Sequence, residues 1–521
     1  MARRTPGHLA LPTAPALAAR RHGRVPLRLD RPLDLFPDAG TELDYVTFAD
    51  LVDRAARLLA AAGVSPGGRV MVVKRPGFDV PLLAFACARL GAVPVLIHPT
   101  VGRHELPVLV ERARPGVIVT DAYADGLGVL GELPAGGPRR WYVGPGGRSL
   151  TALVPGELPE VSAPAPDTEQ LVTHTSGTTG VPKLVRQTAR TFAGQARPQT
   201  VIGQLLRVRD PYLVCISPVH VRTMAAIVST LALGLPFGFM TEPDPRTAAR
   251  MLERVRPGVV ETVPNAFIRW EELADERPEL LAPVRMFLST FDAAHPRTIR
   301  TLLGAGHRHA RYVQVYGQSE TGPVAMKFYR RGRRGRCADG RCVGRPLPGQ
   351  SRVRIAGVGG AGAVGRGTAG AILARTSAVT PSYLGTPDQR TDGWWAMGDF
   401  GVVTDRGCLH LYDRIVDREP GVDSLLALED TILERVPELT EAVLIPVRGG
   451  PPVPVVCTRG DRPLDARAWR AAVAGLPPVA EPVRLAWDDI PHTATWKVKR
   501  AEAARVLEGV RAHDVAHLGR G

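Results

Sequence analysis

Cysteine is scarce in this chain, and its spacing does not build a metal site. Of the six cysteines in 521 residues, only Cys337 and Cys342 lie near each other. No second pair follows that would complete a four-ligand zinc site. We therefore expect a reduced protein that works in the cytoplasm.

Long apolar runs are missing as well. A membrane-spanning helix needs about eighteen or more consecutive apolar residues, and no stretch of the sequence approaches that length. Near the N-terminus two arginines precede a short apolar segment, but Pro12 and Pro15 interrupt it. We therefore expect neither a signal peptide nor a membrane span.

Lysine is scarce too, since only five of the 66 basic residues are lysines in a chain of formal net charge +15. The arginines are scattered among alanine, glycine and proline, which indicates a compositional bias, so nucleic acid is not the expected partner. The dense stretch "YRRGRRGR", residues 329–336, is either a solvated loop or a clamp for an acidic partner. Where arginine is the default cation, Lys183, Lys497 and Lys499 mark places that favour a compact ammonium group.

The length of the chain predicts at least two domains, because one hydrophobic core stops growing well below 521 residues. Residues 46–64 carry a helical stripe of apolar side chains, and "GRVMVVK" at 68–74 follows as a buried strand. This alternation continues to about residue 400 and predicts an α/β domain with largely parallel strands. The pattern then changes to a smaller unit, and we place the boundary between residues 416 and 417.

The stretch "HTSGTTGVPKLV", residues 174–185, has the composition of a loop that leaves a strand. Its glycines allow close approach of the backbone, its hydroxyls donate hydrogen bonds and its lysine adds a charge, which together suit a polyphosphate. The spacing is not that of a Walker A loop, and a flexible linker is the alternative. The candidate residues are Thr175, Ser176, Gly177, Thr178, Thr179, Gly180 and Lys183.

Four later segments carry residues that suit a nucleotide. In "VYGQSETGP", Tyr316 can stack on a base and Glu320 can hold a magnesium ion against phosphate oxygens. Asp399 in "DGWWAMGDFG" suits ribose hydroxyls, "LYDRIVD" offers Arg414, and "PHTATWKVKR" offers Lys497. Taken singly, the tyrosine also fits a core, the aspartate a turn and the arginine a surface ion pair.

With these segments in this order, the chain resembles the adenylate-forming superfamily of acyl-CoA synthetases, firefly luciferase and the adenylation domains of peptide synthetases. The resemblance rests on "TSGTTGVPK", "YGQSE", "GWWAMGD", "DR" and "TATWKVKR", and it extends over nearly the whole chain. It implies an α/β fold with a large N-terminal domain of mixed, largely parallel sheets, residues 1–416, which binds ATP and an acid. A small, mobile C-terminal α+β domain, residues 417–521, would carry the catalytic lysine.

The resemblance also implies roles for the candidate residues. The loop from Thr175 to Lys183 would hold the β- and γ-phosphates. Tyr316, Gly317 and Ser319 would belong to the adenine site, Glu320 would act in catalysis by binding Mg²⁺, and Asp399 and Arg414 would bind the ribose. These assignments predict one nucleotide site built from segments far apart in the sequence.

The same resemblance implies which residues would bind the acid and activate it. Lys497 would bridge the carboxylate and the α-phosphate; it is preferred to Lys499 because it stands three residues before an arginine. His220 matches the family's acid-pocket histidine or aromatic, or else is a packed core histidine. Residues 221–226 and 263–267 would line the acid pocket.

Several positions depart from the family pattern. Trp496 replaces the glycine before the catalytic lysine, and residues 290–292 replace a glycine pair, so the acid site would be small or unusually polar. Residues 417–430 form a short region that lacks the usual lysine and has Leu428 in place of a glutamate. Because this region builds the thioester-forming site in the family, we expect an intact first half-reaction and leave the second open.

We therefore predict an ATP- and Mg²⁺-dependent enzyme that converts a small carboxylic acid to its acyl-adenylate and releases pyrophosphate. The expected acceptor is a thiol, either CoA or the phosphopantetheine of an acyl carrier protein. One alternative is transfer to a nitrogen or oxygen nucleophile, or activation of an unusual acid. The other is a non-catalytic basic protein of the same fold that binds an acidic partner.

Overall fold

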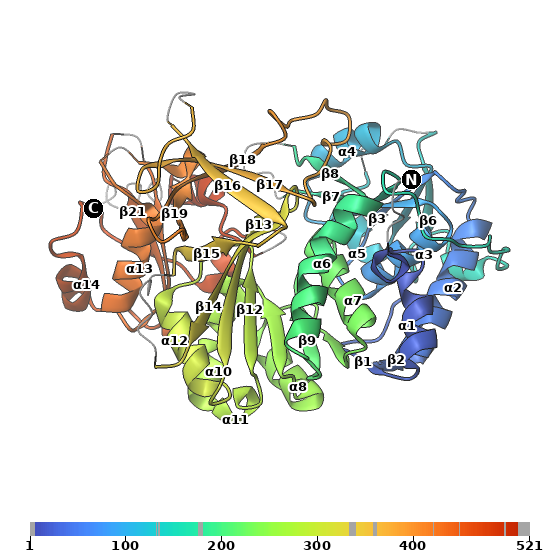
Figure 1. Cartoon of the computed structure of the whole chain (residues 1–521), viewed down its shortest axis with the longest axis horizontal. Coiled ribbons are helices and arrows are strands. Elements are labelled where there is room, and N and C mark those ends of the chain that lie inside the picture. Colours follow the sequence, from blue (N-terminus) through green and yellow to red (C-terminus); the bar gives the residue numbers. More distant parts are fainter. Residues whose placement is uncertain are drawn as a thin grey trace, which may run out of the picture.

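The computed structural model describes residues 6–131, 133, 136–175, 181–332, 340–357, 362–419, 421–447, 449–493 and 496–508. Within these residues the strands form three sheets. Figure 1 shows the N-terminal elements in blue at one end, the largest sheet in the middle and the C-terminal elements in orange and red at the other end. The mixed α/β fold expected from the sequence is confirmed.

The N-terminal part of the chain forms a six-stranded sheet. Its spatial order is β6 (Arg139–Tyr142), β5 (Val117–Thr120), β3 (Arg69–Val73), β4 (Val93–Ile97), β7 (Glu169–His174) and β8 (Leu184–Thr188). All neighbours are parallel except β7 and β8, which are antiparallel. The central strands are buried on both faces, which explains their continuous apolar sequences.

The largest sheet has thirteen strands within the described residues. Their spatial order is β16 (Ser351–Ala356), β17 (Ala369–Thr376), β18 (Trp395–Val403), β19 (Leu409–Arg414), β15 (Cys342–Pro346), β14 (Gly322–Arg330), β13 (Arg311–Gln318), β12 (Met286–Thr290), β11 (Val259–Thr262), β9 (Tyr212–Cys215), β10 (Phe237–Phe239), β1 (Pro26–Leu29) and β2 (Glu42–Asp44). The strands from β13 to β1 in this order are parallel, and the remaining pairs are antiparallel.

Helices cover both larger sheets. In chain order they are α1 (Ala14–His22), α2 (Tyr45–Ala61), α3 (Asp79–Arg89), α4 (Glu105–Ala113), α5 (Ala122–Gly126), α6 (Ala189–Leu205), α7 (Val221–Leu233), α8 (Pro245–Val255), α9 (Pro264–Arg269), α10 (Glu271–Glu276), α11 (Pro278–Leu281) and α12 (Pro296–Ala305). The helix predicted over residues 46–64 is α2, which begins where the Asp44 side chain accepts a hydrogen bond from the Thr47 N–H. No helix in the described part of the chain is long and apolar enough to cross a bilayer.

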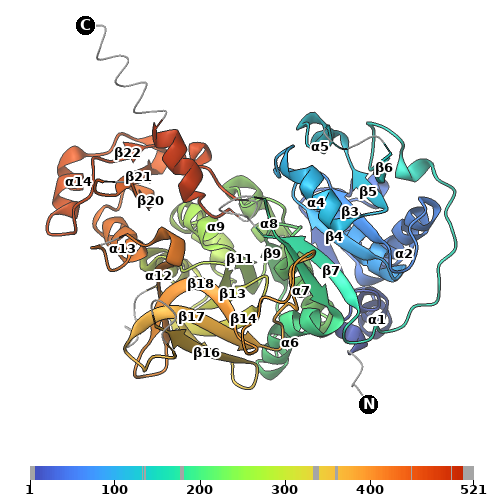
Figure 2. The same cartoon turned by 90° about the horizontal axis from the view of Figure 1, so that it is seen from above.

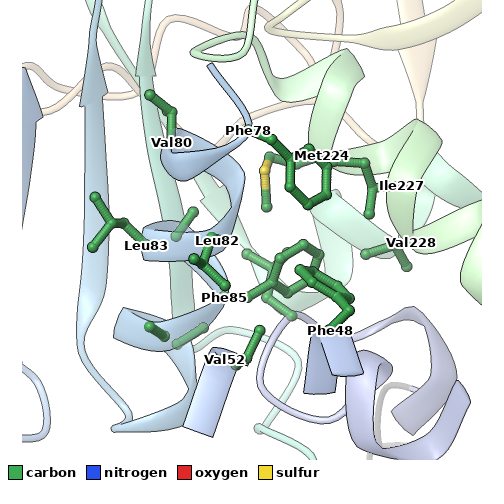
Figure 3. Packing of buried hydrophobic residues seen from close by; sticks show 14 of the residues in the cluster. Phe48, Val52, Phe78, Val80, Leu82, Leu83, Phe85, Met224, Ile227 and Val228 are labelled. Atoms are coloured by element: carbon green, nitrogen blue, oxygen red, sulfur yellow. The ribbon is translucent and has the colours of Figure 1, made fainter. Parts of the chain in front are cut away.

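The main core lies where α2, α3 and α7 meet, as Figure 3 shows. Phe48 from α2 packs edge-on against Phe85 from α3 with ring centres 5.6 Å apart, and it lies 5.5 Å from the ring of Phe78. Met224 and Ile227 of α7 close the cluster from the other side. This packing ties the six-stranded sheet to the helices that cover the large sheet.

The C-terminal elements form a separate small unit with its own sheet. It contains α13 (Leu425–Arg435), β20 (Leu439–Ile445), β21 (Val453–Thr458), α14 (Ala466–Val473) and β22 (Val483–Arg484). Figure 2 shows this unit against α9 and α12 of the larger body, which α13 and β20 contact. The boundary between residues 416 and 417 stays a prediction, and it falls in the short 3-10 turn Ile415–Asp417.

Candidate functional site

The loop predicted to hold phosphates is closed at its base by β7 and β8. The Thr175 N–H donates to the Lys183 carbonyl at 2.9 Å, and the Lys183 N–H donates to Thr175 Oγ1 at 3.2 Å. Lys183 Nζ lies 4.8 Å from the centre of the Tyr383 ring. The other predicted loop residues, Ser176, Gly177, Thr178, Thr179 and Gly180, lie outside the described residues, so their role stays a prediction.

A buried carboxylate lies on the same side of the site as Lys183. Tyr383 Oη donates to Glu320 Oε1 at 3.0 Å, so one tyrosine contacts both Glu320 and the lysine. Burial raises the pKa of Glu320, although the Tyr383 hydrogen bond and the Lys183 charge oppose this rise. A carboxylate in this position can bind a cation.

The donor set around Glu320 fits the magnesium ion that the sequence predicts. Across the described residues, no group of three or more histidine, cysteine, aspartate or glutamate side chains could hold a metal ion unaided. Mg²⁺ in nucleotide sites is commonly held by one or two carboxylates, with water and phosphate oxygens as the remaining ligands. A single carboxylate near Lys183, the lysine predicted to bind phosphate, is consistent with that arrangement.

The residues predicted for adenine and ribose form one cluster. Tyr316 Oη donates to Asp399 Oδ2 at 2.6 Å, and Arg414 Nε lies 3.7 Å from Asp399 Oδ1. The sheet causes this arrangement, because β18 and β19 pair Asp399 directly with Arg414. Burial raises the pKa of Asp399, and the Tyr316 hydroxyl and the Arg414 charge only partly offset this effect.

A tight backbone turn brings Tyr316 and Glu320 close together. β13 and β14 shift register between Tyr316 and Gly317. A Cβ atom on Gly317 would lie 2.1 Å from the Gly322 carbonyl oxygen, so no larger residue fits there. The Ser319 carbonyl accepts hydrogen bonds from two buried glutamine side chains, which fixes the turn.

His220 lies beside this turn at the start of α7. Its Nδ1 accepts a hydrogen bond from the Arg222 N–H at 3.0 Å, so Nε2 carries the proton and donates to Ser319 Oγ at 2.9 Å. The Phe291 ring packs against it with centres 4.4 Å apart. Burial and the nearby His174 and Lys497 lower the pKa of His220 to about 3, so the imidazole stays neutral.

The C-terminal unit places Lys497 in the site. Lys497 Nζ lies 3.2 Å from Asp292 Oδ2, at the end of β12. Asn265 Nδ2 donates to the Trp496 carbonyl at 2.9 Å, which holds the segment against the larger body. Trp496 has a φ of +57°, a conformation that glycine adopts without strain, at the position where the family resemblance predicts glycine. Lys499, the rival candidate, pairs with Glu502 at 2.9 Å.

Asp292 is held as an anion in this arrangement. Burial favours its neutral form, but the Lys497 charge and the Ala293 N–H outweigh burial and lower its pKa. Asp292 therefore neutralises the charge of Lys497 in this structure.

Sequence reasoning missed a buried polar network beside the site. Arg222 of α7 forms an ion pair with Glu261 of β11, and Gln199 and Tyr212 hydrogen-bond to the same pair. A signal was present, because each of the two residues is the one charged residue of its helix or strand. Among residues 221–226 and 263–267, Arg222 is the one that lines an apolar cavity within the described part of the chain, and the lining of an acid pocket by these two segments stays a prediction.

Replacing Tyr316 with phenylalanine is expected to weaken ATP binding about tenfold, because a hydrogen bond to a charged acceptor contributes about 1.5 kcal/mol or more. The variant keeps the ring but leaves Asp399 without the donor that orients it. Calorimetric titration with a non-hydrolysable ATP analogue measures the change. Tyr123→Phe, at a tyrosine that is 46% exposed, is the matched control; equal dissociation constants for both variants would contradict the assignment.

Three comparisons place the chain among known proteins. The family described as AMP-binding enzyme matches residues 18–384. The 3-amino-2-hydroxy-4-methoxybenzoate diazotase of Streptomyces cremeus is 38% identical over 528 residues, covering 95% of each chain. The salicyl-AMP ligase / salicyl-S-ArCP synthetase of Mycobacterium tuberculosis is 26% identical over 395 residues, covering 72% of this chain and 68% of the relative. The ATP-bound structure of MatB from Rhodopseudomonas palustris superposes with a TM-score of 0.76 at 22% identity, covering 95% of this chain and 99% of that one.

Proposed function

This chain belongs to the AMP-binding enzyme family of adenylate-forming ligases, and we propose that it forms the adenylate of a small oxyacid and passes the activated group to the nitrogen of an aromatic amine. The placement of Lys497 beside Asp292, next to the buried Asp399 and Tyr316 cluster, carries the adenylation step. The identity of 38% over nearly the whole chain with a diazotase supports the choice of acceptor. The family resemblance and the expectation of a ligase are confirmed, and the non-catalytic alternative finds no support.

Different residues would act in different parts of the adenylation step. Thr175 and Lys183, at the base of the loop, would hold the phosphates that leave as pyrophosphate. Mg²⁺ at Glu320 would neutralise phosphate charge. Lys497 Nζ would leave Asp292 and counter the charge that develops as the acid oxygen attacks the α-phosphorus.

The second step follows from the chemistry of diazotisation. An aromatic amine becomes a diazonium ion by gaining a nitrosyl group and losing water, and nitrous acid is the simplest acid that supplies this group. Nitrite oxygen would attack the α-phosphorus as the bond to pyrophosphate breaks. The amine nitrogen would then attack the nitrosyl nitrogen, AMP would leave with the electrons of the N–O bond, and the resulting nitrosamine would lose water after protonation.

A carboxylic acid with a thiol acceptor is the second candidate. It is supported by the relative from Mycobacterium tuberculosis, whose name, salicyl-S-ArCP synthetase, indicates transfer to sulfur. In this case CoA or a carrier-protein phosphopantetheine would enter the site after adenylation. The short region 417–430, which lacks the family's usual lysine, speaks against this candidate.

Pyrophosphate release from ATP and Mg²⁺ separates the two candidates. We expect release to depend on nitrite, to rise when an aminobenzoate is added, and to produce a diazonium ion that couples to 2-naphthol as a coloured azo product. CoA should have no effect. Release that requires a benzoate or an aliphatic acid and is accelerated by CoA, without azo product, would replace this proposal with the thiol candidate.

A further inference from the structure

An apolar cavity lies beneath α6, between this helix and the large sheet. Its volume is about 70 Å³, which gives room for a ring substituent and the ring edge that bears it rather than for a whole small molecule. Alternate positions of the parallel strands line it, Met286, Leu288 and Thr290 of β12 and Val313 and Val315 of β13. Because side chains alternate along a strand, this row faces one side of the sheet. Thr290 and Val315 directly precede Phe291 and Tyr316 of the candidate site.

One charged pair interrupts the apolar lining. Arg222 Nε donates to Glu261 Oε1 at 2.5 Å, and Nη2 donates to Glu261 Oε2 at 2.8 Å. The Glu261 side chain is fully buried, and Tyr212 Oη donates to it. The two charges cancel, so the cavity carries no net charge from this pair, and a second buried carboxylate here would lack a counter-ion.

Gln199 of α6 connects this pair to the cavity. Its Oε1 accepts a hydrogen bond from Arg222 Nη2 at 2.5 Å. Because a guanidinium group has only donors, the arginine fixes the orientation of the amide, with the oxygen toward the arginine and Nε2 away from it. Arg222 therefore acts as a positioning residue for the Gln199 amide.

Two polar atoms at the cavity lack partners. Gln199 Nε2 and Thr290 Oγ1 are both buried, and neither has a hydrogen-bond partner among the residues that the structure describes. Both residues line the cavity. Buried donors are normally satisfied, so a ligand or a water molecule that supplies an acceptor would complete these two.

We propose that the cavity receives the substituted edge of the substrate's aromatic ring and that Gln199 Nε2 and Thr290 Oγ1 donate to an uncharged oxygen substituent there, a hydroxyl or ether oxygen. The proposal rests on the proposed function, since the cavity adjoins the site that holds Lys497. It names the substrate class: an oxygen-substituted arene rather than an alkyl chain or an arene with a second carboxylate at this position.

Binding of matched ligand pairs tests the inference without any turnover. Isothermal titration would compare methoxyanilines with ethylanilines, and methoxybenzoates with ethylbenzoates, substituted at each ring position. Each pair has nearly the same shape and differs in the oxygen atom. We expect the wild-type protein to bind one methoxy compound about tenfold more tightly than its ethyl partner, as loss of one hydrogen bond implies.

Gln199→Leu and Thr290→Val are each expected to reduce this preference to about twofold or less. Gln204→Leu is the matched control, because Gln204 lies on the same helix with its side chain exposed, and it should keep the full preference. The inference would be overturned if the wild-type protein shows no preference, or if both variants keep it. A preference seen only with the benzoates would leave the inference standing and overturn the amine acceptor instead.

Discussion

Lys497→Ala is expected to reduce pyrophosphate release about a thousandfold, because one preorganised group that stabilises transition-state charge contributes about two to three orders of magnitude. ATP affinity should change little. The described residues predicted to contact the nucleotide, among them Tyr316, Glu320 and Asp399, lie in the larger body and keep their hydrogen bonds. Single-turnover measurements with saturating ATP separate this loss of rate from any loss of binding.

Lys499→Ala is the control for that experiment. Its ammonium group pairs with Glu502 on the following helix and is 36% exposed, so its removal should leave the rate close to that of the wild-type protein. Full activity in Lys497→Ala, or equal losses in the two variants, would remove Lys497 from the mechanism.

The elements of the fold could largely be predicted because each one has a local signal. The apolar run predicted as a strand at residues 68–74 appears as β3, and the stripe over residues 46–64 appears as α2. The order of the strands could not be predicted in this way. β1 pairs with β10 through Leu27 and Phe237, and nothing local to either strand encodes a contact between segments so far apart.

In the candidate site, too, residues with a local sequence signal could be predicted and residues without one could not. Short motifs with unusual residues pointed to Tyr316, Asp399 and Arg414, and the structure brings these three side chains together. The Arg222 and Glu261 pair carries no motif, and its members come from α7 and β11, two elements that are far apart in the sequence. A charge inside an apolar run signals that a partner exists, but it does not identify that partner.

His295 explains how the C-terminal unit stays in place to present Lys497. It stands before α12, and its Nδ1 lies 2.5 Å from Asp430 Oδ1 of α13 while its Nε2 lies 3.4 Å from Glu441 Oε1 of β20. Burial opposes the charge of the imidazolium, but the two carboxylates outweigh burial and hold the pKa of His295 well above its usual range. Arg297 and Arg300 contact the same small unit through the Leu433 carbonyl and the Glu434 side chain.

The direction of the pH dependence follows from this raised pKa. The imidazolium stabilises docking fully below the ordinary histidine pKa near 6.5, and this contribution is lost as the pH rises through the pKa of the docked state. Deprotonation leaves Asp430 and Glu441 without the charge between them. We therefore expect the docked population, and the Lys497-dependent rate with it, to fall on the alkaline side.

His295→Gln should remove this dependence and weaken docking by about 3 to 5 kcal/mol, the usual effect of deleting one partner of a buried ion pair. Limited proteolysis of the segment between the units and the rate of pyrophosphate release would both report the loss. Arg300→Gln tests the same interface through a pair that is 57% and 50% exposed, and it should cost less than about 1 kcal/mol. If the two variants behave alike, or if docking in the wild-type protein tightens as the pH rises, His295 does not hold the units together, and the contacts of Asn265 with the Trp496 carbonyl and of Arg459 with Glu271 become the better explanation.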